Sequence, residues 1–236
     1  QAFPHLKECL GKTILTTDGT SVLGADDKAG VAEIMTAAEK LLALGGKHAT
    51  LKIGFTPDEE IGRGADLFDV KGFGADYAYT VDGGAIGELE YENFNAASAH
   101  VIVHGRNIHP GSAKNKMINS QYIAMEFVNL LPVHQRPEST EGYEGFYHLD
   151  TFTGECDGAN MAYILRDHNA EILEHRKEVF RAAADYLNTK YGAGTVEVQI
   201  RDSYRNMREV IEKHYHLIEN ACKAFETLGV KPLISP

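Results

Sequence analysis

The stretch from Leu51 to Glu60 (LKIGFTPDEE) constrains the fold of this chain more than any other. Its apolar residues alternate with a lysine and a glycine, which is the period of a strand, until a Thr-Pro pair interrupts the pattern. Because proline cannot continue a strand ladder, we expect Asp58, Glu59 and Glu60 to lie just past the carboxyl end of the strand. Ligands of open α/β sheets bind at that edge. The alternative interpretation is an acidic surface turn.

The same arrangement occurs twice more. A strand is predicted over 13–17, upstream of a loop that carries Asp26 and Asp27, and a strand over 75–81 ends at Asp82. Strands that alternate with helices and end in acids predict a mixed, mostly parallel sheet with the acids collected along one edge. Adjacent carboxylates repel one another, so such a site favours a cation or a proton. A helix cap is the simpler interpretation of one of the two neighbouring aspartates.

The chain divides into three segments. We expect residues 1–94 to form part of a catalytic α/β domain, with a helix that ends at Gly45-Gly46. In residues 95–207 the predicted order is β-α-β-β-α-β, that of a ferredoxin-like unit, so this segment is predicted to be an inserted domain. Residues 208–236, with a helix over 209–228, are expected to return to the first domain. The elements expected in the insertion are strands over 96–103, 146–156, 161–166 and 196–201 and helices over 117–131 and 170–191.

Composition and charge exclude several classes of function. The 23 basic and 34 acidic residues give a net charge of −11, which disfavours a nucleic acid partner. No apolar stretch approaches the roughly 20 residues that a bilayer crossing needs. The three cysteines are odd in number and far apart, so neither a disulfide framework nor a thiolate zinc site is expected. With no signal peptide visible, the prediction is a cytoplasmic protein.

A metal site follows if Asp26, Asp82 and one of Glu59 and Glu60 converge. Every donor would then be an oxygen, which suits magnesium, calcium or manganese, whereas a zinc site normally includes histidine. The sequence contains no His-Glu-x-x-His pattern. The residues alone therefore predict a carboxylate site without fixing the metal.

Six motifs follow one another along the chain: GADDKAG, FTPDEEIGRGA, YTVDGG, NIHPGSAK, TEGYEGFYHL and YILRD. In this order and spacing they resemble the aminotripeptidases of the co-catalytic di-zinc exopeptidase family, which includes carboxypeptidase G and succinyl-diaminopimelate desuccinylase. The resemblance runs from end to end. It implies a metallo-aminopeptidase that hydrolyses the N-terminal peptide bond of tripeptides through a zinc-activated water. It also implies that the inserted domain acts as a lid or dimerisation domain, and hence a homodimer.

The resemblance assigns the acids to separate roles. It implies that Asp26 bridges two zinc ions, that Glu60 is a ligand of one ion and that Asp82 is a ligand of the other. Glu59 is then the general base, which takes a proton from the water and passes it to the leaving amine. Asp27 matches a family position that is not a ligand.

Two further roles are implied in the inserted domain. His109 in NIHPGSAK would donate a hydrogen bond to the developing oxyanion. Arg166 in YILRD would bind the terminal carboxylate of the peptide, which a planar guanidinium can hold through two parallel bonds. The alternatives are a turn residue for His109 and an ion pair with a nearby acid for Arg166.

The chain departs from the family pattern in two places. Family members carry a ligand histidine in a His-x-Asp upstream of the GADD loop and a second one after an R-G-G-T-D-G-type loop, and neither occurs here. We therefore expect a central fragment of such an enzyme that binds zinc weakly if at all and is inactive by itself. The alternatives are another di-zinc amidohydrolase, acting on an acylated amino acid or a longer peptide, and a non-catalytic fragment that acts in dimerisation.

Overall fold

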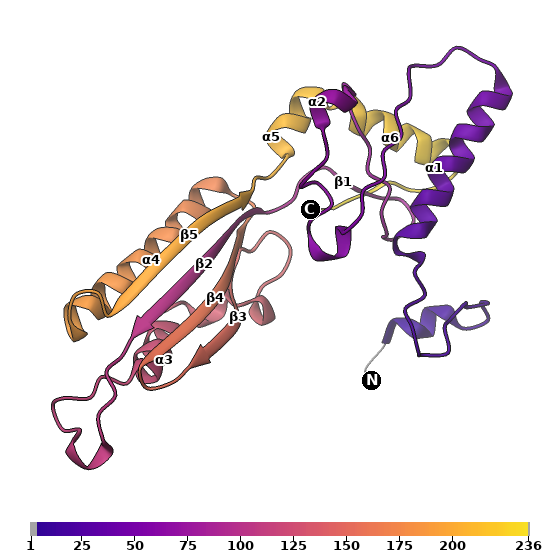
Figure 1. Cartoon of the computed structure of the whole chain (residues 1–236). Coiled ribbons are helices and arrows are strands. Elements are labelled where there is room, and N and C mark those ends of the chain that lie inside the picture. Colours follow the sequence, from indigo (N-terminus) through magenta and orange to yellow (C-terminus); the bar gives the residue numbers. More distant parts are fainter. Residues whose placement is uncertain (1–3, 236) are drawn as a thin grey trace. The chain divides into compact units, whose positions relative to one another are not determined.

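The computed structural model describes residues 4–235 of the chain. The chain forms two compact units, residues 1–85 and 86–236. Figure 1 traces their helices and strands. Among the described residues, no helix combines the length and apolar character that a membrane crossing requires.

The unit of residues 1–85 is built around one long helix, α1. The helix ends where the sequence predicts, because Gly45 adopts a left-handed conformation (φ 59°) that glycine takes without steric cost. Its amino end is irregular, since the backbone at Asp26 and Asp27 is not helical. Residues 64–67 form turns. The described elements are the 3₁₀ helix η1 (Pro4–Cys9), α1 (Ala25–Leu44), the 3₁₀ helix η2 (Glu59–Ile61) and α2 (Val70–Phe73).

The strands predicted over 13–17, 51–55 and 75–81 are wrong, because all three segments lack regular secondary structure. An alternating apolar pattern predicts which side chains would be buried, but a strand also needs a neighbour to satisfy its backbone. No described segment pairs with these three. Leu51 and Phe55 are accordingly 56% and 51% exposed.

The unit of residues 86–236 contains a four-stranded antiparallel sheet with the order β3-β4-β2-β5 (Figure 1). Along the chain its elements follow the order β-α-β-β-α-β, so the ferredoxin-like arrangement and the mixed α/β class predicted from the sequence are confirmed. The strands are β2 (Asn95–His104), β3 (Phe146–Gly154), β4 (Gly158–Asp167) and β5 (Val196–Tyr204), and the helices are α3 (Ser120–Leu130) and α4 (Ala170–Tyr191).

The core of this sheet lies on one face. Side chains of alternate β2 residues, such as Val101 and Val103, are fully buried and form one apolar cluster with α3 and α4. Phe127 of α3 and Phe180 of α4 meet edge to face in it, with ring centroids 5.4 Å apart. Burial of each such side chain contributes roughly 1.5–3 kcal/mol. The intervening strand residues point to the opposite face of the sheet.

The remaining elements of this unit lie before, between and after the strands of the sheet. The only parallel pairing among the described residues joins β1 (Glu88–Glu90) to β6 (Leu233–Ser235). The helix predicted over 209–228 is divided by a 3₁₀ turn. The other elements are η3 (Pro110–Ser112), η4 (Val133–Gln135), η5 (Pro137–Ser139), α5 (Arg208–Ile211), η6 (Glu212–His214) and α6 (His216–Thr227).

A hydrogen-bonded clamp ties the segment that enters the sheet to the segment that leaves it. Asn95 Oδ1 accepts from the backbone N–H of Asn206 at 3.0 Å, and Asn93 Oδ1 accepts from that of Met207 at 2.9 Å. The buried Glu92 carboxylate accepts from Arg208 Nη1 at 3.2 Å. These hydrogen bonds therefore hold the segment that leads into β2 against the segment that follows β5.

Candidate metal centre

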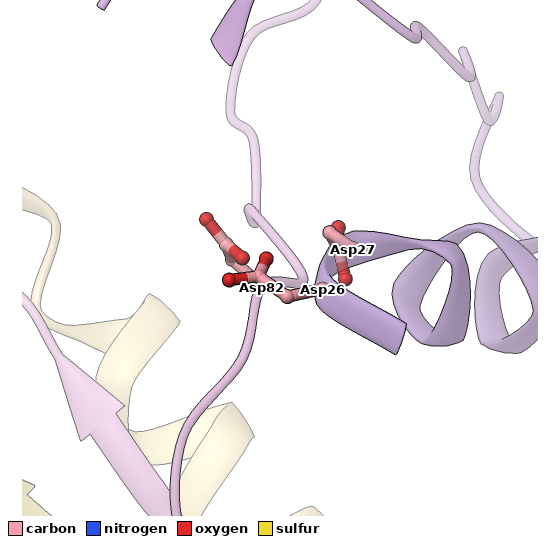
Figure 2. Close-up of side chains that lie close together, drawn as sticks. All are labelled: Asp26, Asp27 and Asp82. Carbon is pink, nitrogen blue, oxygen red and sulfur yellow. The ribbon is translucent and has the colours of Figure 1, made fainter. Parts of the chain in front are cut away.

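Three carboxylates of residues 1–85 come together. One oxygen each of Asp26, Asp27 and Asp82 lies within 4.8 Å of the other two, which makes them the one group of three or more metal-binding side chains found among the described residues. Figure 2 shows Asp26 and Asp27 at the amino end of α1 and Asp82 on a separate segment. The peptide bond between Asp26 and Asp27 is cis. Asp26 and Asp82 are exposed and Asp27 is half-buried.

Gly30 allows this close approach. A Cβ atom at this position would lie 2.4 Å from the carbonyl oxygen of Val81 and 2.5 Å from Asp27 Oδ1. Both distances are far shorter than an ordinary carbon–oxygen contact of about 3.3 Å. Only glycine therefore lets the segment that carries Asp82 lie against the first turn of α1.

The two neighbouring aspartates have different surroundings. Asp27 Oδ1 accepts a hydrogen bond from the backbone N–H of Gly30 at 3.0 Å, so Asp27 caps the regular part of α1. The cap predicted for one of the pair is thus found at Asp27. Asp82 Oδ1 accepts from the N–H of Gly83 at 2.7 Å.

The cluster carries uncompensated negative charge. Within residues 4–235, none of the three carboxylates forms an ion pair with a lysine, arginine or histidine. Mutual repulsion of such anions is relieved by a bound cation. Oxygen donors alone fit a hard divalent ion, and they fit zinc once imidazole ligands complete the set.

Glu59 and Glu60 lie outside this cluster. Both belong to η2, which follows Asp58, a residue held in the left-handed region at φ 64°. Glu59 and Glu60 form one 3₁₀ turn with Ile61, and successive side chains of such a turn are about 120° apart. The two carboxylates point in different directions, and both residues are exposed.

His109 and Arg166 both lie in the unit of residues 86–236. His109 is exposed and precedes η3, where its Nδ1 accepts a hydrogen bond from the backbone N–H of Gly111 at 3.2 Å. Arg166 is half-buried near the end of β4, and its guanidinium lies over the ring of Tyr204. The ion pair considered for Arg166 is not formed with any described acid. The sequence analysis did not identify Gly30, which permits the close approach, or Tyr204, whose ring lies over Arg166. The Asp-x-x-Gly spacing of Asp27 and Gly30 is the one sequence signal for Gly30, and no such signal marks Tyr204.

Comparison with known proteins identifies relatives along nearly the whole chain. Residues 91–195 match the family model described as the peptidase dimerisation domain. The chain is 56% identical to peptidase T of Caldanaerobacter subterraneus subsp. tengcongensis over 235 residues, which are 99% of this chain and 58% of that protein. It is 57% identical to peptidase T of Desulfitobacterium hafniense strain DCB-2, again over 99% of this chain and 57% of the relative. These matches confirm the resemblance that the six motifs indicate.

Solved structures show the same fold. The chain aligns with the crystal structure of aminopeptidase PepT from Bacillus cereus at a TM-score of 0.79 and 25% identity, covering 94% of this chain and 61% of that one. It aligns with the crystal structure of a tripeptidase from Staphylococcus aureus at a TM-score of 0.75 and 23% identity, and the alignment covers 93% of this chain and 59% of that one. The chain thus spans somewhat more than half the length of the relatives it matches.

Proposed function

We propose that the protein to which this chain belongs is a zinc-dependent aminopeptidase that removes the N-terminal residue of tripeptides. The observation that carries the proposal is the similarity to peptidase T over 99% of the chain. The convergence of Asp26 with Asp82 supports it, because these residues come from two separate motifs of the resemblance. An oxygen-donor cluster without a cationic side chain is what a metal-dependent hydrolase needs.

In this proposal Asp26, Asp82 and Glu60 would serve as the carboxylate ligands of two zinc ions, and imidazole ligands would complete the coordination. When bound, zinc would lower the pKa of a coordinated water to near 7 and would polarise the scissile carbonyl. Asp27 keeps its structural role, since its carboxylate caps α1.

Glu59 is the proposed general base. Its exposed carboxylate forms no ion pair with another described residue, so it is free to accept a proton from the attacking water. Glu59 then passes that proton to the leaving amine, which departs as a neutral group. Adjacent residues can hold a metal and move a proton because their side chains diverge on the 3₁₀ turn.

His109 is the proposed donor to the oxyanion that develops at the scissile carbonyl. Its Nδ1 accepts the hydrogen bond from Gly111, so in the neutral imidazole the proton resides on Nε2. Nε2 is therefore the ring nitrogen that can donate a hydrogen bond. An exposed imidazole with this tautomer can donate to a substrate oxygen.

Arg166 is the proposed binding site for the terminal carboxylate of the peptide. Recognition of that terminus limits the length of the substrate, and a guanidinium fits a carboxylate through two parallel hydrogen bonds. The absence of an acidic partner among the described residues supports this role. The alternative use of Arg166, a structural ion pair, would consume the same donors.

The proposal includes the domain organisation and assembly expected from the sequence. Residues 95–207 form the inserted lid or dimerisation domain, residues 1–94 and 208–236 belong to the catalytic domain, and the protein is a homodimer. The match of residues 91–195 to a peptidase dimerisation domain supports this assembly. We also propose a cytoplasmic location, which fits the three cysteines, all free in the described chain.

The test uses the full-length protein. Hydrolysis of di-, tri- and tetrapeptides is measured together with metal content by mass spectrometry, before and after dialysis against a chelator. We expect preferential cleavage of tripeptides, loss of activity with the metal and recovery on addition of zinc. Hydrolysis of N-acyl amino acids without tripeptide cleavage would instead point to a related amidohydrolase. A metal-free, inactive protein that still dimerises would contradict an enzymatic function.

A further inference from the structure

An aromatic ring covers the face of the Arg166 guanidinium. The Cζ atom of Arg166 lies 5.0 Å from the centroid of the Tyr204 ring, within the range of a cation–π interaction. Both residues belong to the four-stranded sheet, Arg166 to β4 and Tyr204 to β5. Tyr204 is 47% exposed, so its ring is not part of the apolar core.

The register of the sheet explains how two residues on non-adjacent strands meet. Arg166 pairs with Ala96 of the intervening strand β2, and Ala96 in turn pairs with Tyr204. Leu165 precedes Arg166 and Ala97 follows Ala96, and both Leu165 and Ala97 are buried in the apolar cluster on the helix side of the sheet. Because successive side chains of a strand point to opposite faces, Arg166 and Ala96 point to the other face. Because Ala96 contributes only a methyl group, nothing separates the guanidinium from the ring.

The ring contact leaves the hydrogen-bonding edge of Arg166 available. A guanidinium carries five N–H donors in its plane, whereas a cation–π contact uses the face perpendicular to them. The side-chain hydrogen bond found for Arg166 runs from Nη1 to the carbonyl oxygen of Leu165 at 3.4 Å, which is long. Tyr204 therefore holds the group in place without consuming the donors that bind a carboxylate.

A second arginine of the same domain shows what such an edge binds. The Cζ atom of Arg176 also lies 5.0 Å from a tyrosine ring, that of Tyr147. Its edge is occupied, because Nε donates to the buried Asp167 carboxylate at 2.8 Å and Nη1 donates to Gln135 at 2.6 Å. In both sites a tyrosine ring covers the face of the guanidinium. At Arg166, however, no described carboxylate accepts a hydrogen bond from the N–H groups at the edge of the guanidinium.

We propose that Tyr204 is a positioning residue that orients Arg166 for the terminal carboxylate of the peptide substrate. This inference rests on the proposed function, because it assumes that Arg166 receives a carboxylate. Tyr204 acts through Arg166 and needs no contact with the substrate. Its hydroxyl forms no hydrogen bond with another described residue, so the ring alone carries the effect.

The experiment measures KM and kcat of the full-length enzyme for a tripeptide and for the same tripeptide with an amidated carboxyl end. Tyr204→Leu should raise KM for the free acid by about 2- to 30-fold, the range of a cation–π contact, with kcat little changed. KM for the amide should not move. Tyr204→Phe keeps the ring and should restore KM, and Tyr204→Met provides a second variant without a ring in case leucine is poorly tolerated. Tyr186→Leu on α4 is the matched control, since Tyr186 is 52% exposed.

A double mutant separates positioning from a general structural effect. In an Arg166→Ala background, Tyr204→Leu should add nothing to KM, because the group it orients is gone. A wild-type KM in Tyr204→Leu and Tyr204→Met, or an equal effect on the free acid and the amide, overturns the inference while the proposed function stands. A wild-type enzyme without tripeptidase activity refutes the proposed function and this inference with it.

Discussion

Gly30→Ala tests whether the close approach of α1 and the Asp82 segment creates the metal centre. The added Cβ would lie 2.4 Å from the Val81 carbonyl oxygen and 2.5 Å from Asp27 Oδ1. Restoring an ordinary contact requires a shift of about 1 Å between the two segments. Val81 precedes Asp82 and Asp27 follows Asp26, so the shift is transmitted directly to both proposed ligands.

The magnitude of this effect follows from opposing contributions. Overpacking costs about 1–3 kcal/mol of unfolding free energy, and replacing a helical glycine by alanine returns about 0.5–1 kcal/mol. The net loss of stability is therefore modest. Metal affinity should suffer more, by about 10- to 100-fold, because displaced supporting groups misalign the ligands.

The assay for Gly30→Ala is zinc titration of the metal-free full-length protein by calorimetry, with thermal unfolding measured alongside. Gly46→Ala is the matched control, since a Cβ at Gly46 meets no atom within 4 Å. The variant Gly46→Ala should bind zinc like the wild type. If Gly30→Ala also binds zinc with wild-type affinity, the close approach at Gly30 does not organise the site.

Three other predictions concern single residues. Glu59→Ala should retain its metal content while kcat falls by at least about 10²-fold, and unchanged turnover would remove Glu59 as the base. Asp82→Asn should lower zinc content measured by mass spectrometry, whereas full occupancy would exclude Asp82 as a ligand. Burial lowers the pKa of His168, against the opposing effect of the Glu92 and Asp167 carboxylates, and its Nδ1 has no hydrogen-bond partner among the described residues. The folded state therefore resists protonation, and stability should fall as the pH drops below about 6.5, by at most about 1.4 kcal/mol per pH unit. Thermal unfolding of His168→Phe between pH 7.5 and 5 should show a smaller slope, and an equal slope would refute this assignment.

The sequence predicted the four-stranded sheet and the helices α3 and α4 well because their signals are local. Helix α4 (Ala170–Tyr191) begins and ends at the predicted residues, since a capping asparagine and a terminal glycine mark its ends. An Asp-Gly pair, a strong local turn signal, lies between β3 and β4, which form an antiparallel hairpin. Strand patterns failed over 13–17, 51–55 and 75–81 because pairing depends on a partner elsewhere in the chain, which alternation does not report.

For the candidate metal centre too, some features could be predicted from the sequence and others depended on the tertiary structure. By itself, the sequence determined which carboxylates follow turn-forming residues and which family motifs contain them. Only the tertiary structure decided that the Asp82 carboxylate belongs to the same close group as that of Asp26, because Gly30 permits the Asp82 segment to approach the first turn of α1. It also decided that Tyr204 reaches Arg166, since that contact depends on strand register and on the small side chain of Ala96 between them. Local periodicity fixes the direction of a side chain, whereas proximity between distant residues depends on how the backbone packs.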